Sequence, residues 1–469
     1  MIVNCKNREL NFSIDAPPSK SIYHRELIIR FLCGDYSHLN ILDNDSNDIR
    51  ETKTILQCLY NIINQSNFKT VEYSNTDSNI NSNIDSDIDL GNNSTAESGS
   101  KKLTFFPCGE SGSTLRLMIP VISALILGEG NPDYGLDGFT IGTQGRLFDR
   151  PIKALRDAMK PHGINIEKIP ETRSILVTGK MKPGDYTIDG SVSSQYISGL
   201  LIALTAFDQP STVNVSGEFE SIHYVELTQD VLAKYNCPAI KSAEQVNCFY
   251  PTAGGYKKAA TESEAIKADF RVEGDWSNGA FLLCMQRWSD ITVNNLNPDS
   301  RQGDKEILEY LELVDHVLSG DKTKYVCKSD GMITLDENMN NIYCDCTNIP
   351  DIAPYMAVIA PFVFDKITFS GIGRLRIKES DRVKAVITQL SNIGVRTVET
   401  DDELTVYRYN VTEDIQNKKI YLPAFNDHRM VMCAILIAVI LKCEVDIDNI
   451  FCIKKSFPEF IEYIERYMK

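Results

Sequence analysis

Short polar motifs recur along this chain at nearly even spacing, and each opens a strongly apolar stretch with helical periodicity. Successive motifs are separated by 92, 82, 81, 76 and 77 residues, and they lie around Lys20, Gly112, Ser194, Asp275, Asp351 and His428. Self-similarity at a constant period is typical of a protein built from repeated structural units. The sequence therefore predicts about six similar units.

A second series of helix starts alternates with the first. Its members are separated by 98, 76, 80, 76 and 77 residues, and they lie near Asp48, Arg146, Ile222, Gln302, Lys378 and Lys455. Helices of the first series, such as Leu115–Leu127, are apolar on every side and should be buried, whereas those of the second, such as Asp304–Leu313, keep a polar face. Strand-like runs separate the helices, at 175–178, 291–294, 367–370 and 404–407. These elements predict an α/β fold in which each unit combines strands with two helices.

A polar insertion lengthens the first interval of both series. Residues from about 75–100 are mostly Asn, Asp and Ser, with too few apolar side chains to pack, so we expect a disordered surface loop there. Asp85, Asp87 and Asp89 have the spacing of a calcium-binding loop. The glycine that should follow the third acid is missing and Ala96 stands at the twelfth position, so a solvated low-complexity segment is the better interpretation.

The charge balance limits the kinds of partner. The 469 residues include 48 Lys and Arg against 64 Asp and Glu, a formal net charge of -16. This acidic balance argues against nucleic acid or an anionic membrane as the partner. Small anions remain compatible with it, because exposed charges are screened beyond about 8 Å at physiological salt and a local cluster of cations can attract phosphates.

Signals of the cellular compartment favour the cytoplasm. Residues 1–6 lack the apolar core of a signal peptide, and no apolar run approaches the ~20 residues that a membrane helix needs. The 13 cysteines include no Cys-x-x-Cys pair, so neither a disulfide framework nor a zinc site is indicated. We expect reduced thiols and a cytoplasmic protein.

The segment Arg374–Arg382 combines four cations and two carboxylates in nine residues. The alternation of its cations predicts an extended segment, and Ser380 and Asp381 then supply the acceptors that favour a helix start. Taken alone, the segment could be a solvated helix start with local ion pairs, which are common and weak. The recurrence of similar junctions, several with Lys or Arg beside Gly and Ser, favours a functional interpretation.

Helix starts are natural anion sites, because unpaired backbone N–H groups point outward there. The starts at 19–25, 109–114 and 191–195 add hydroxyls, glycines and cations, as a phosphate or a carboxylate would need. Neither phosphate-loop pattern occurs, so nucleotide binding is not supported. His428 has no second His or Cys nearby in the sequence, and Ser193 and Ser194 lack a triad, so we expect no metal, no cofactor and no nucleophilic serine.

Five motifs, in order, resemble those of the 5-enolpyruvylshikimate-3-phosphate synthase family over essentially the whole chain: 17–21, 112–116, 190–195, 374–382 and 426–430. The resemblance implies a two-domain inside-out α/β barrel with three strand-helix repeats in each domain, in agreement with the six units. It also implies a discontinuous domain formed by residues 1–18 and 272–469 and an inserted domain formed by residues 19–271. The active site would then lie between the domains.

The resemblance implies a function and a set of site residues. The enolpyruvyl group of phosphoenolpyruvate would be transferred to the 5-hydroxyl of shikimate-3-phosphate, with release of phosphate. Residues that would bind shikimate-3-phosphate are Lys20, Ser21, Arg25, Ser193, Ser194, Ser221, Asp351 and Lys378. Residues that would bind phosphoenolpyruvate are Lys20, Gly112, Arg146, Gln195, Arg382, Arg429 and Lys455. Asp351 would be the base and Glu379 the acid, with Lys20 as a competing donor or stabiliser.

The chain departs from the family pattern at a few positions. Glu110 stands where many members have Asn, and an acid there should weaken anion binding unless it is paired or points away. Arg374 and Leu375 replace an Asn-Trp pair of some members, which leaves contacts to the shikimate ring open. Gly112, in place of Ala, leaves room beside phosphoenolpyruvate and hints at susceptibility to glyphosate.

Two other functions compete with this one. The related UDP-N-acetylglucosamine enolpyruvyl transferases share the fold and the donor, but their Lys-Asn start is Lys20-Ser21 here. A catalytically inactive anion-binding relative is the other alternative, against which the joint presence of Lys20, Asp351 and Glu379 argues. The resemblance implies a monomer that acts on small molecules.

Overall fold

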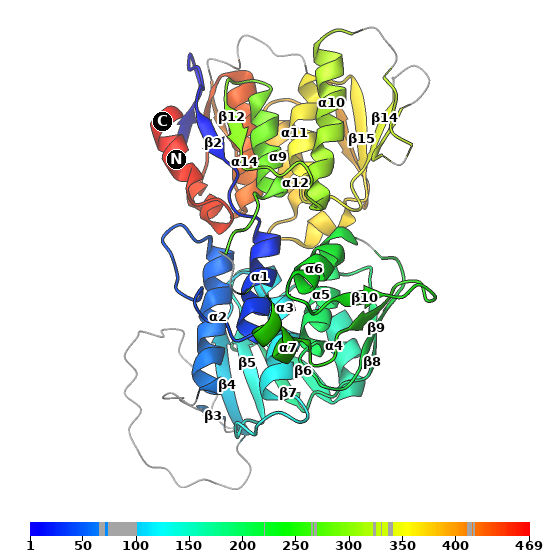
Figure 1. The fold of residues 1–469 in the computed structure, drawn as a ribbon. Helices are drawn as coiled ribbons and strands as arrows, with labels where there is room; N and C mark the ends of the chain where they lie inside the picture. The colour runs from blue at the N-terminus through cyan, green and yellow to red at the C-terminus, as the bar shows by residue number, and fades with distance from the viewer. Residues whose placement is uncertain are drawn as a thin grey trace, which may run out of the picture.

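The computed structural model describes residues 1–469 except 65–70, 74–100, 220, 264–265, 267–269, 322–324, 330, 336–340, 410–414 and 416–417. The polar loop expected at 75–100 lies outside the described residues. The chain forms two halves, one above the other, and both termini lie together on the upper half (Figure 1). Each half has its own core of buried apolar side chains, formed in the upper half by residues from 3–14 and 276–468 and in the lower half by residues from 22–259.

In its described residues the lower half contains two sheets, with strand orders β3-β4-β5-β7-β6 and β10-β11-β9-β8. Its strands are β3 (Val71–Tyr73), β4 (Lys101–Pro107), β5 (Gly138–Gly142), β6 (Ile164–Ile169), β7 (Ser174–Gly179), β8 (Asp185–Asp189), β9 (Thr212–Ser216), β10 (Ala239–Lys241) and β11 (Cys248–Pro251). Its helices are α1 (Lys20–Leu32), α2 (Asn47–Ile63), α3 (Gly112–Ile126), α4 (Lys153–Met159), α5 (Ser194–Leu204), α6 (His223–Lys234) and α7 (Gly255–Glu262), with a 3₁₀ turn η1 (Lys160–His162).

The part of the upper half that the structure describes contains three sheets, with strand orders β13-β14-β15-β17-β16, β1-β19-β18 and β12-β2. Its strands are β1 (Ile2–Asn4), β2 (Ser13–Asp15), β12 (Thr292–Asn294), β13 (Ile333–Leu335), β14 (Ile342–Asp345), β15 (Lys366–Ser370), β16 (Thr397–Glu399), β17 (Leu404–Tyr407), β18 (Lys419–Tyr421) and β19 (Glu444–Asp446). Its α-helices are α9 (Trp276–Gln286), α10 (Ile307–Leu318), α11 (Ala353–Ile359), α12 (Arg382–Asn392), α14 (His428–Leu441) and α15 (Phe460–Tyr467). Its 3₁₀ turns are η2 (Gly303–Glu306), η3 (Ala360–Phe362), η4 (Gly373–Ile377) and η5 (Ile450–Lys455).

The two five-stranded sheets share one pattern of strand order and direction. In each, an antiparallel pair, a parallel pair and two further antiparallel pairs follow one another across the sheet. The parallel pairs β4–β5 and β14–β15 are bridged by α3 and α11, as parallel strands require a crossover. Within the described residues every sheet is open, so the fold is mixed α/β with an internal similarity between its halves.

The crossover helices are buried because their sequences are apolar on every side, as predicted from the first series of helix starts. Helix α14 is the clearest case, since every residue from His428 to Val439 is buried. A helix that is apolar all round belongs inside a core. The polar groups of such a helix then concentrate at its ends, and its N-terminus here is capped by Asp427, whose side chain accepts a hydrogen bond from the N–H of Arg429.

In the described residues the chain crosses from one half to the other twice, and the two crossing segments lie side by side. Pro18 and Gly274 form an isolated antiparallel bridge. The N–H of Ser19 donates to the carbonyl of Glu273 at 2.8 Å, and the N–H of Asp275 donates to that of Pro17 at 2.7 Å. The outgoing and returning segments are therefore held side by side at the level of the interface.

Three local predictions are wrong. The alternating cations from Arg374 do not lie on an extended segment, because residues 373–377 form the 3₁₀ turn η4 and the following helix starts at Arg382 after its cap Asp381. The helix predicted near Arg146 starts at Lys153, because Pro151 follows a run of turns. The helix predicted near Lys455 starts at Phe460, since a 3₁₀ turn ends at Lys455. Among the described residues, no helix is long and apolar enough to cross a membrane.

Candidate active site

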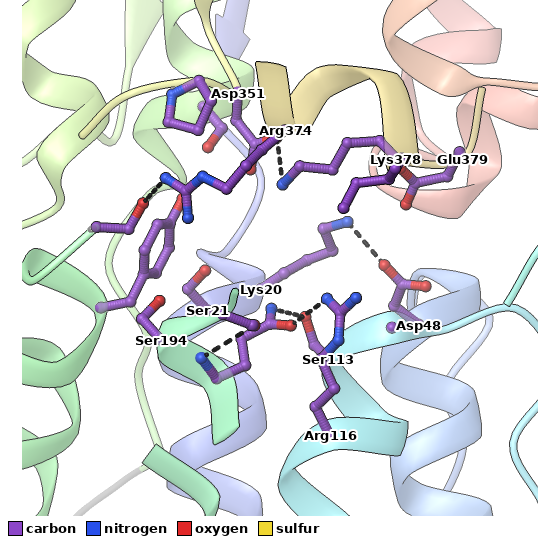
Figure 2. A pocket seen from close by; sticks show the side chains of 18 of the residues that line it. Lys20, Ser21, Asp48, Ser113, Arg116, Ser194, Asp351, Arg374, Lys378 and Glu379 are labelled. Atoms are coloured by element: carbon purple, nitrogen blue, oxygen red, sulfur yellow. Dashed lines mark hydrogen bonds and ion pairs between the residues drawn. The ribbon is translucent and has the colours of Figure 1, made fainter. Parts of the chain in front are cut away.

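The N-termini of six buried helices converge on one cavity between the halves. The lower half contributes the starts of α1, α3 and α5 and the upper half those of α9, α11 and α14. Figure 2 shows part of this wall, with Lys20 and Ser194 from the lower half and Asp351 from the upper half. The cavity encloses about 1030 Å³, including space open to solvent. Lining residues at these starts are Lys20, Ser21, Gly112, Ser113, Ser193, Ser194, Gln195, Asp275, Ser277, Pro350, Asp351, His428 and Arg429. Because helix N-termini carry partial positive charge and unpaired N–H groups, this arrangement favours anions.

Side chains strengthen the positive character of the cavity. Seven lining residues are Lys or Arg and four are Asp or Glu, although the whole chain has a formal net charge of -16. The cations are Lys20, Arg116, Arg150, Arg374, Lys378, Arg382 and Arg429. A cavity that concentrates cations in this way can hold a multiply charged anion despite an acidic exterior.

Arg382 joins the carboxylates on the upper wall. Its side chain is 2% exposed, and its Nη1 lies 2.9 Å from Asp351 Oδ1 while its Nη2 lies 2.8 Å from Glu379 Oε2. Its Nε donates to Asp427 Oδ2 at 2.8 Å. One guanidinium therefore binds three carboxylates and sets their separation through its planar fork of donors.

Asp351 is surrounded by cations. Lys378 Nζ lies 3.5 Å from Asp351 Oδ1, and Arg429 Nη2 lies 3.6 Å from Asp351 Oδ2. Burial by itself would raise the pKa of Asp351, but Lys378, Arg429 and Arg382 outweigh it and hold that pKa well below its usual value. Asp351 is therefore an ionised carboxylate in the empty site.

Glu379 contacts cations from both halves. Arg150 Nη2, from the lower half, lies 3.2 Å from Glu379 Oε2, and Lys455 Nζ lies 3.4 Å from Glu379 Oε1. Burial raises the pKa of Glu379, but Arg382, Lys455 and Arg150 more than offset this and hold the pKa well below its usual value. Glu379 is thus also ionised in the empty site, and it occupies a position that an anion would compete for.

Two lysines face each other across the cavity from α1 and from the turn before α12 (Figure 2). Lys20 Nζ lies 2.8 Å from Asp48 Oδ2, and its backbone N–H donates to Asp275 Oδ2 across the interface at 3.1 Å. Lys378 approaches Asp351, as described above. Burial lowers the pKa of Lys378 to about 8, although Asp351 opposes this effect.

Neutral donors and acceptors complete the lower wall. Gln195 donates through Nε2 to Ser113 Oγ at 2.7 Å and accepts from Arg116 Nη1 at 2.9 Å (Figure 2). Arg374 Nη2 donates to Ser221 Oγ at 2.8 Å, so this pair also joins the two halves. Hydroxyls and an amide already held by charged partners are suited to orienting a ligand.

Arg25 does not line the cavity and lies behind its wall. The guanidinium donates to Thr228 Oγ1 at 2.7 Å and to Ser198 Oγ at 3.1 Å. It also donates to the carbonyls of Ser21 at 2.6 Å and Tyr224 at 2.8 Å. Burial lowers the pKa of Arg25 to about 10. These four partners are neutral, and two of them belong to residues of the cavity wall.

Arg146 is not brought to the cavity. Its side chain is exposed, whereas Arg150, four residues later, is buried and lines the cavity. A Cβ atom added to Gly112 would lie 2.5 Å from Arg150 Nη1, so the missing side chain at Gly112 lets this guanidinium approach the start of α3. Arg150 therefore lies on the cavity wall, where the resemblance had implied Arg146.

Glu110 is paired. Its Oε2 lies 3.8 Å from Lys455 Nζ, and its backbone carbonyl accepts a hydrogen bond from the same ammonium at 3.3 Å. Burial lowers the pKa of Lys455, but Glu379, Asp48 and Glu110 together raise it above its usual value. Lys455 thus stays charged beside the cavity, and the negative charge of Glu110 is partly neutralised.

The remaining expected residues lie on the wall, but several wall residues had not been predicted as functional. Those that were missed are Asp48, Ser113, Arg116, Arg150, Val192, Tyr224, Asp275, Ser277, Pro350, Arg374, Ile377 and His428. Their signal in the sequence is their position at a predicted helix start or within four residues of one. Burial is the main reason that the pKa of His428 lies well below its usual value, so this side chain is neutral. Among the described residues, no group of His, Cys, Asp and Glu side chains could hold a metal ion.

Comparison with protein-family models gives a match over residues 5–464 to EPSP synthase (3-phosphoshikimate 1-carboxyvinyltransferase). A 3-phosphoshikimate 1-carboxyvinyltransferase of Clostridium kluyveri is 30% identical over 98% of this chain and 96% of that protein. One of Clostridioides difficile is 28% identical over 97% and 94% of the two chains.

Solved structures share the fold. An EPSP synthase from Acinetobacter baumannii has a TM-score of 0.61 at 15% identity and covers 100% of this chain and 98% of its own. The enolpyruvyl transferase NikO from Streptomyces tendae has a TM-score of 0.57 at 11% identity, with 100% and 97% covered. The enolpyruvyl transferase fold is therefore common to all three chains.

Proposed function

Because this chain belongs to the EPSP synthase (3-phosphoshikimate 1-carboxyvinyltransferase) family, we propose that the cavity between its halves is where the family reaction takes place. The enzyme transfers the enolpyruvyl group of phosphoenolpyruvate to the 5-hydroxyl of shikimate-3-phosphate and releases phosphate, in the shikimate pathway to chorismate and aromatic amino acids. The observation that carries the proposed site is the convergence of six helix N-termini and seven cations on one cavity. Both substrates are multiply charged anions, so such a cavity offsets their charge.

We assign shikimate-3-phosphate to the side of the cavity formed by α1, α5 and the region of Asp351. Residues that would bind it are Lys20, Ser21, Ser193, Ser194, Ser221, Asp351 and Lys378. Arg25 would act from behind the wall, where its buried charge has only neutral partners among the contacts described above. A buried guanidinium with neutral partners is stabilised when a carboxylate or phosphate comes near.

We assign phosphoenolpyruvate to the cations around Glu379. Residues that would bind it are Lys20, Gly112, Arg150, Gln195, Arg382, Arg429 and Lys455. Arg150, Arg382 and Lys455 converge on the Glu379 carboxylate from three separate elements. A carboxylate or phosphate of the substrate could take over these contacts with the geometry that guanidinium groups favour.

Asp351 would be the base that takes the proton from the 5-hydroxyl. Its carboxylate is ionised in the empty site, as a base must be. The cations that hold its pKa low are also those that would bind the substrates. When bound anions share these cations, the pKa of Asp351 rises and its carboxylate becomes a better proton acceptor.

Glu379 would be the acid that protonates the methylene carbon of phosphoenolpyruvate. In the empty site it is ionised, so it must first gain a proton. Anionic groups of the substrate near Arg150, Arg382 and Lys455 would neutralise these cations and raise the pKa of Glu379. Lys20 remains the alternative donor or stabiliser, with its Nζ held by Asp48.

The finer architecture belongs to the same proposal. We take residues 1–18 with 272–469 as one domain and 19–271 as the other, each a three-unit part of an inside-out α/β barrel. The two separate cores, the shared strand pattern and the bridge between Pro18 and Gly274 support this division. We further propose a cytoplasmic monomer that binds no nucleic acid, in keeping with 13 free cysteines and a net charge of -16.

A phosphate-release assay tests the function. Purified protein with phosphoenolpyruvate should release phosphate when shikimate-3-phosphate is added and should not do so with UDP-N-acetylglucosamine. Release only with the sugar nucleotide would indicate the related transferase, and release with neither acceptor would indicate an inactive relative. The first result is expected, because the joint presence of Asp351, Glu379 and their cations in one cavity leaves the site complete.

A further inference from the structure

Glu51, on α2, lies outside the reaction described above, yet its carboxylate contacts the turn that leads into α3. Its Oε1 accepts a hydrogen bond from the N–H of Glu110 at 3.1 Å, and its Oε2 accepts one from the N–H of Ser111 at 2.8 Å. Each oxygen thus holds one of two consecutive backbone N–H groups. One side chain therefore fixes the position of both N–H groups relative to α2.

The turn is shaped to receive this carboxylate. Gly109 has a φ of +57°, and a Cβ atom added to it would lie 2.0 Å from Glu51 Oε1. On the opposite side, the carbonyl of Gly109 accepts a hydrogen bond from the N–H of Gln144 at 2.7 Å. The turn is therefore held between α2 and the segment that precedes Arg150, and its glycine is required both by backbone conformation and by the approach of Glu51.

The same turn positions the start of α3. The hydroxyl of Ser111 accepts a hydrogen bond from the N–H of Thr114 at 3.2 Å and so caps the helix. Thr114 Oγ1 lies 2.7 Å from Thr52 Oγ1, which links α3 to α2 a second time. Gly112, between these residues, is the position against which the guanidinium of Arg150 lies. A displacement of the turn would therefore move a helix start and an arginine of the cavity together.

We propose that Glu51 is a positioning residue for the binding of phosphoenolpyruvate. Glu51 holds the turn 109–111 in place, so that Gly112 and Arg150 present their donors to this substrate. The proposal rests on the function stated above and adds a residue that touches neither substrate. Helix α2 then serves both substrates, because Asp48, three residues before Glu51, holds Lys20.

The surroundings of Glu51 disfavour the ionised form of its carboxyl group. Burial and the nearby Asp48 raise the pKa of Glu51 to about 8, against the opposing effects of the two N–H groups and of Lys455. Glu110 and Cys108 are the other titratable groups at this turn, and burial and Glu51 hold the pKa of Cys108 well above its usual value. A raised carboxyl pKa means that the folded protein is less stable when Glu51 is ionised than when Glu51 is protonated. Loss of the negative charge of Glu51 should therefore not by itself destabilise the fold.

Steady-state kinetics of Glu51→Gln test the proposal. The amide keeps one acceptor oxygen but faces the second N–H with a donor, so we expect the KM for phosphoenolpyruvate to rise about tenfold, equivalent to ~1.4 kcal/mol. We expect kcat and the KM for shikimate-3-phosphate to stay within about twofold, and the melting temperature not to fall. Glu309→Gln is the matched control, since Glu309 also accepts a hydrogen bond from a backbone N–H, that of Ile333 at 3.2 Å, and lies away from the cavity.

The possible results separate the inference from the function. A wild-type protein that releases no phosphate contradicts the function. With an active wild type, an unchanged KM for phosphoenolpyruvate in Glu51→Gln overturns the inference. A lower melting temperature with equal losses for both substrates also overturns it, because Glu51 would then be a structural residue. The same rise in KM in Glu309→Gln would show that the effect is not local and would likewise overturn it.

Discussion

Arg150 Nη2 lies 3.2 Å from Glu379 Oε2, so an arginine of the lower half pairs with a carboxylate of the upper half across the cavity. The two side chains are 8% and 14% exposed. This pair joins the anion-binding wall of one half to the proposed acid of the other. Loss of the Arg150 side chain should therefore affect both the binding of phosphoenolpyruvate and the position of Glu379.

Replacing Arg150 with Gln should reduce kcat/KM for phosphoenolpyruvate by about 30-fold or more, because truncating a buried charge-assisted contact costs ~2–5 kcal/mol. The exposed Arg146 provides the matched control, and Arg146→Gln should stay within about twofold of the wild type. Initial rates of phosphate release measure both. Similar losses in the two variants would show that the structural position of Arg150 does not determine its role.

Gly112→Ala should weaken phosphoenolpyruvate binding, since the added methyl group would lie 2.5 Å from Arg150 Nη1 and force this guanidinium away. The wild type should be inhibited by glyphosate in competition with phosphoenolpyruvate. In Gly112→Ala the inhibition constant should rise by about tenfold, which corresponds to ~1.4 kcal/mol. Inhibition titrations at several phosphoenolpyruvate concentrations check this, and non-competitive inhibition of the wild type would count against the assignment of Gly112.

Asp351→Asn and Glu379→Gln should each reduce kcat by about 10²–10⁴-fold, the usual contribution of a positioned acid or base. Both substitutions keep the shape of the side chain and change its ability to exchange a proton. Circular dichroism should show the wild-type fold in each variant. Turnover at the wild-type rate in either one would refute the role given to that carboxylate.

Acid should destabilise the empty protein through the same two carboxylates. Their folded pKa values lie below the unfolded values of about 3.9 and 4.3, so their contribution to stability is present above these values and is lost as the pH falls further. Urea unfolding at a series of pH values should therefore show a loss of stability below about pH 5. This loss should be smaller in Asp351→Asn and Glu379→Gln. If the free energy of unfolding fell with pH in these variants as it does in the wild type, the low pKa values would be contradicted.

Shikimate-3-phosphate should bind with uptake of a proton at pH 8.5. Burial lowers the pKa of Lys378 to about 8, so this lysine is mostly neutral at that pH in the empty site. A phosphate beside it favours the charged form and raises its pKa, which draws a proton from the solvent. Calorimetric titrations in buffers of different ionisation enthalpy measure the uptake. The uptake should disappear in Lys378→Met, and its persistence there would assign the proton to another group.

The sequence was most informative where local rules decide the structure. Helices that begin at Lys20, Gly112, Ser194 and His428 were predicted from apolar periodicity, and all four start at those residues. A helix that is apolar on every side is buried along its length. Its polar side chains are therefore found at its ends. This is why the cavity wall could be anticipated from helix starts.

Predictions failed where a turn intervenes. The spacing of the second series indicated Arg146, but Gly145 and Pro151 frame a turn that delays the helix and brings Arg150 to the cavity. The alternating cations after Gly373 imitate a strand, yet the backbone forms a 3₁₀ turn. The role proposed for Glu51 could not be predicted from the sequence, because it depends on contacts with residues 110 and 111, which lie about 60 residues further along the chain.

The bridge between Pro18 and Gly274 places the two ends of the lower half next to each other, with Ser19 N only 2.8 Å from the carbonyl oxygen of Glu273. A domain whose N- and C-terminal ends lie next to each other can be inserted into a loop of another protein without distorting either one. The lower half could therefore be produced as a separate polypeptide, or rejoined with new termini, so that each wall of the cavity could be studied apart from the other.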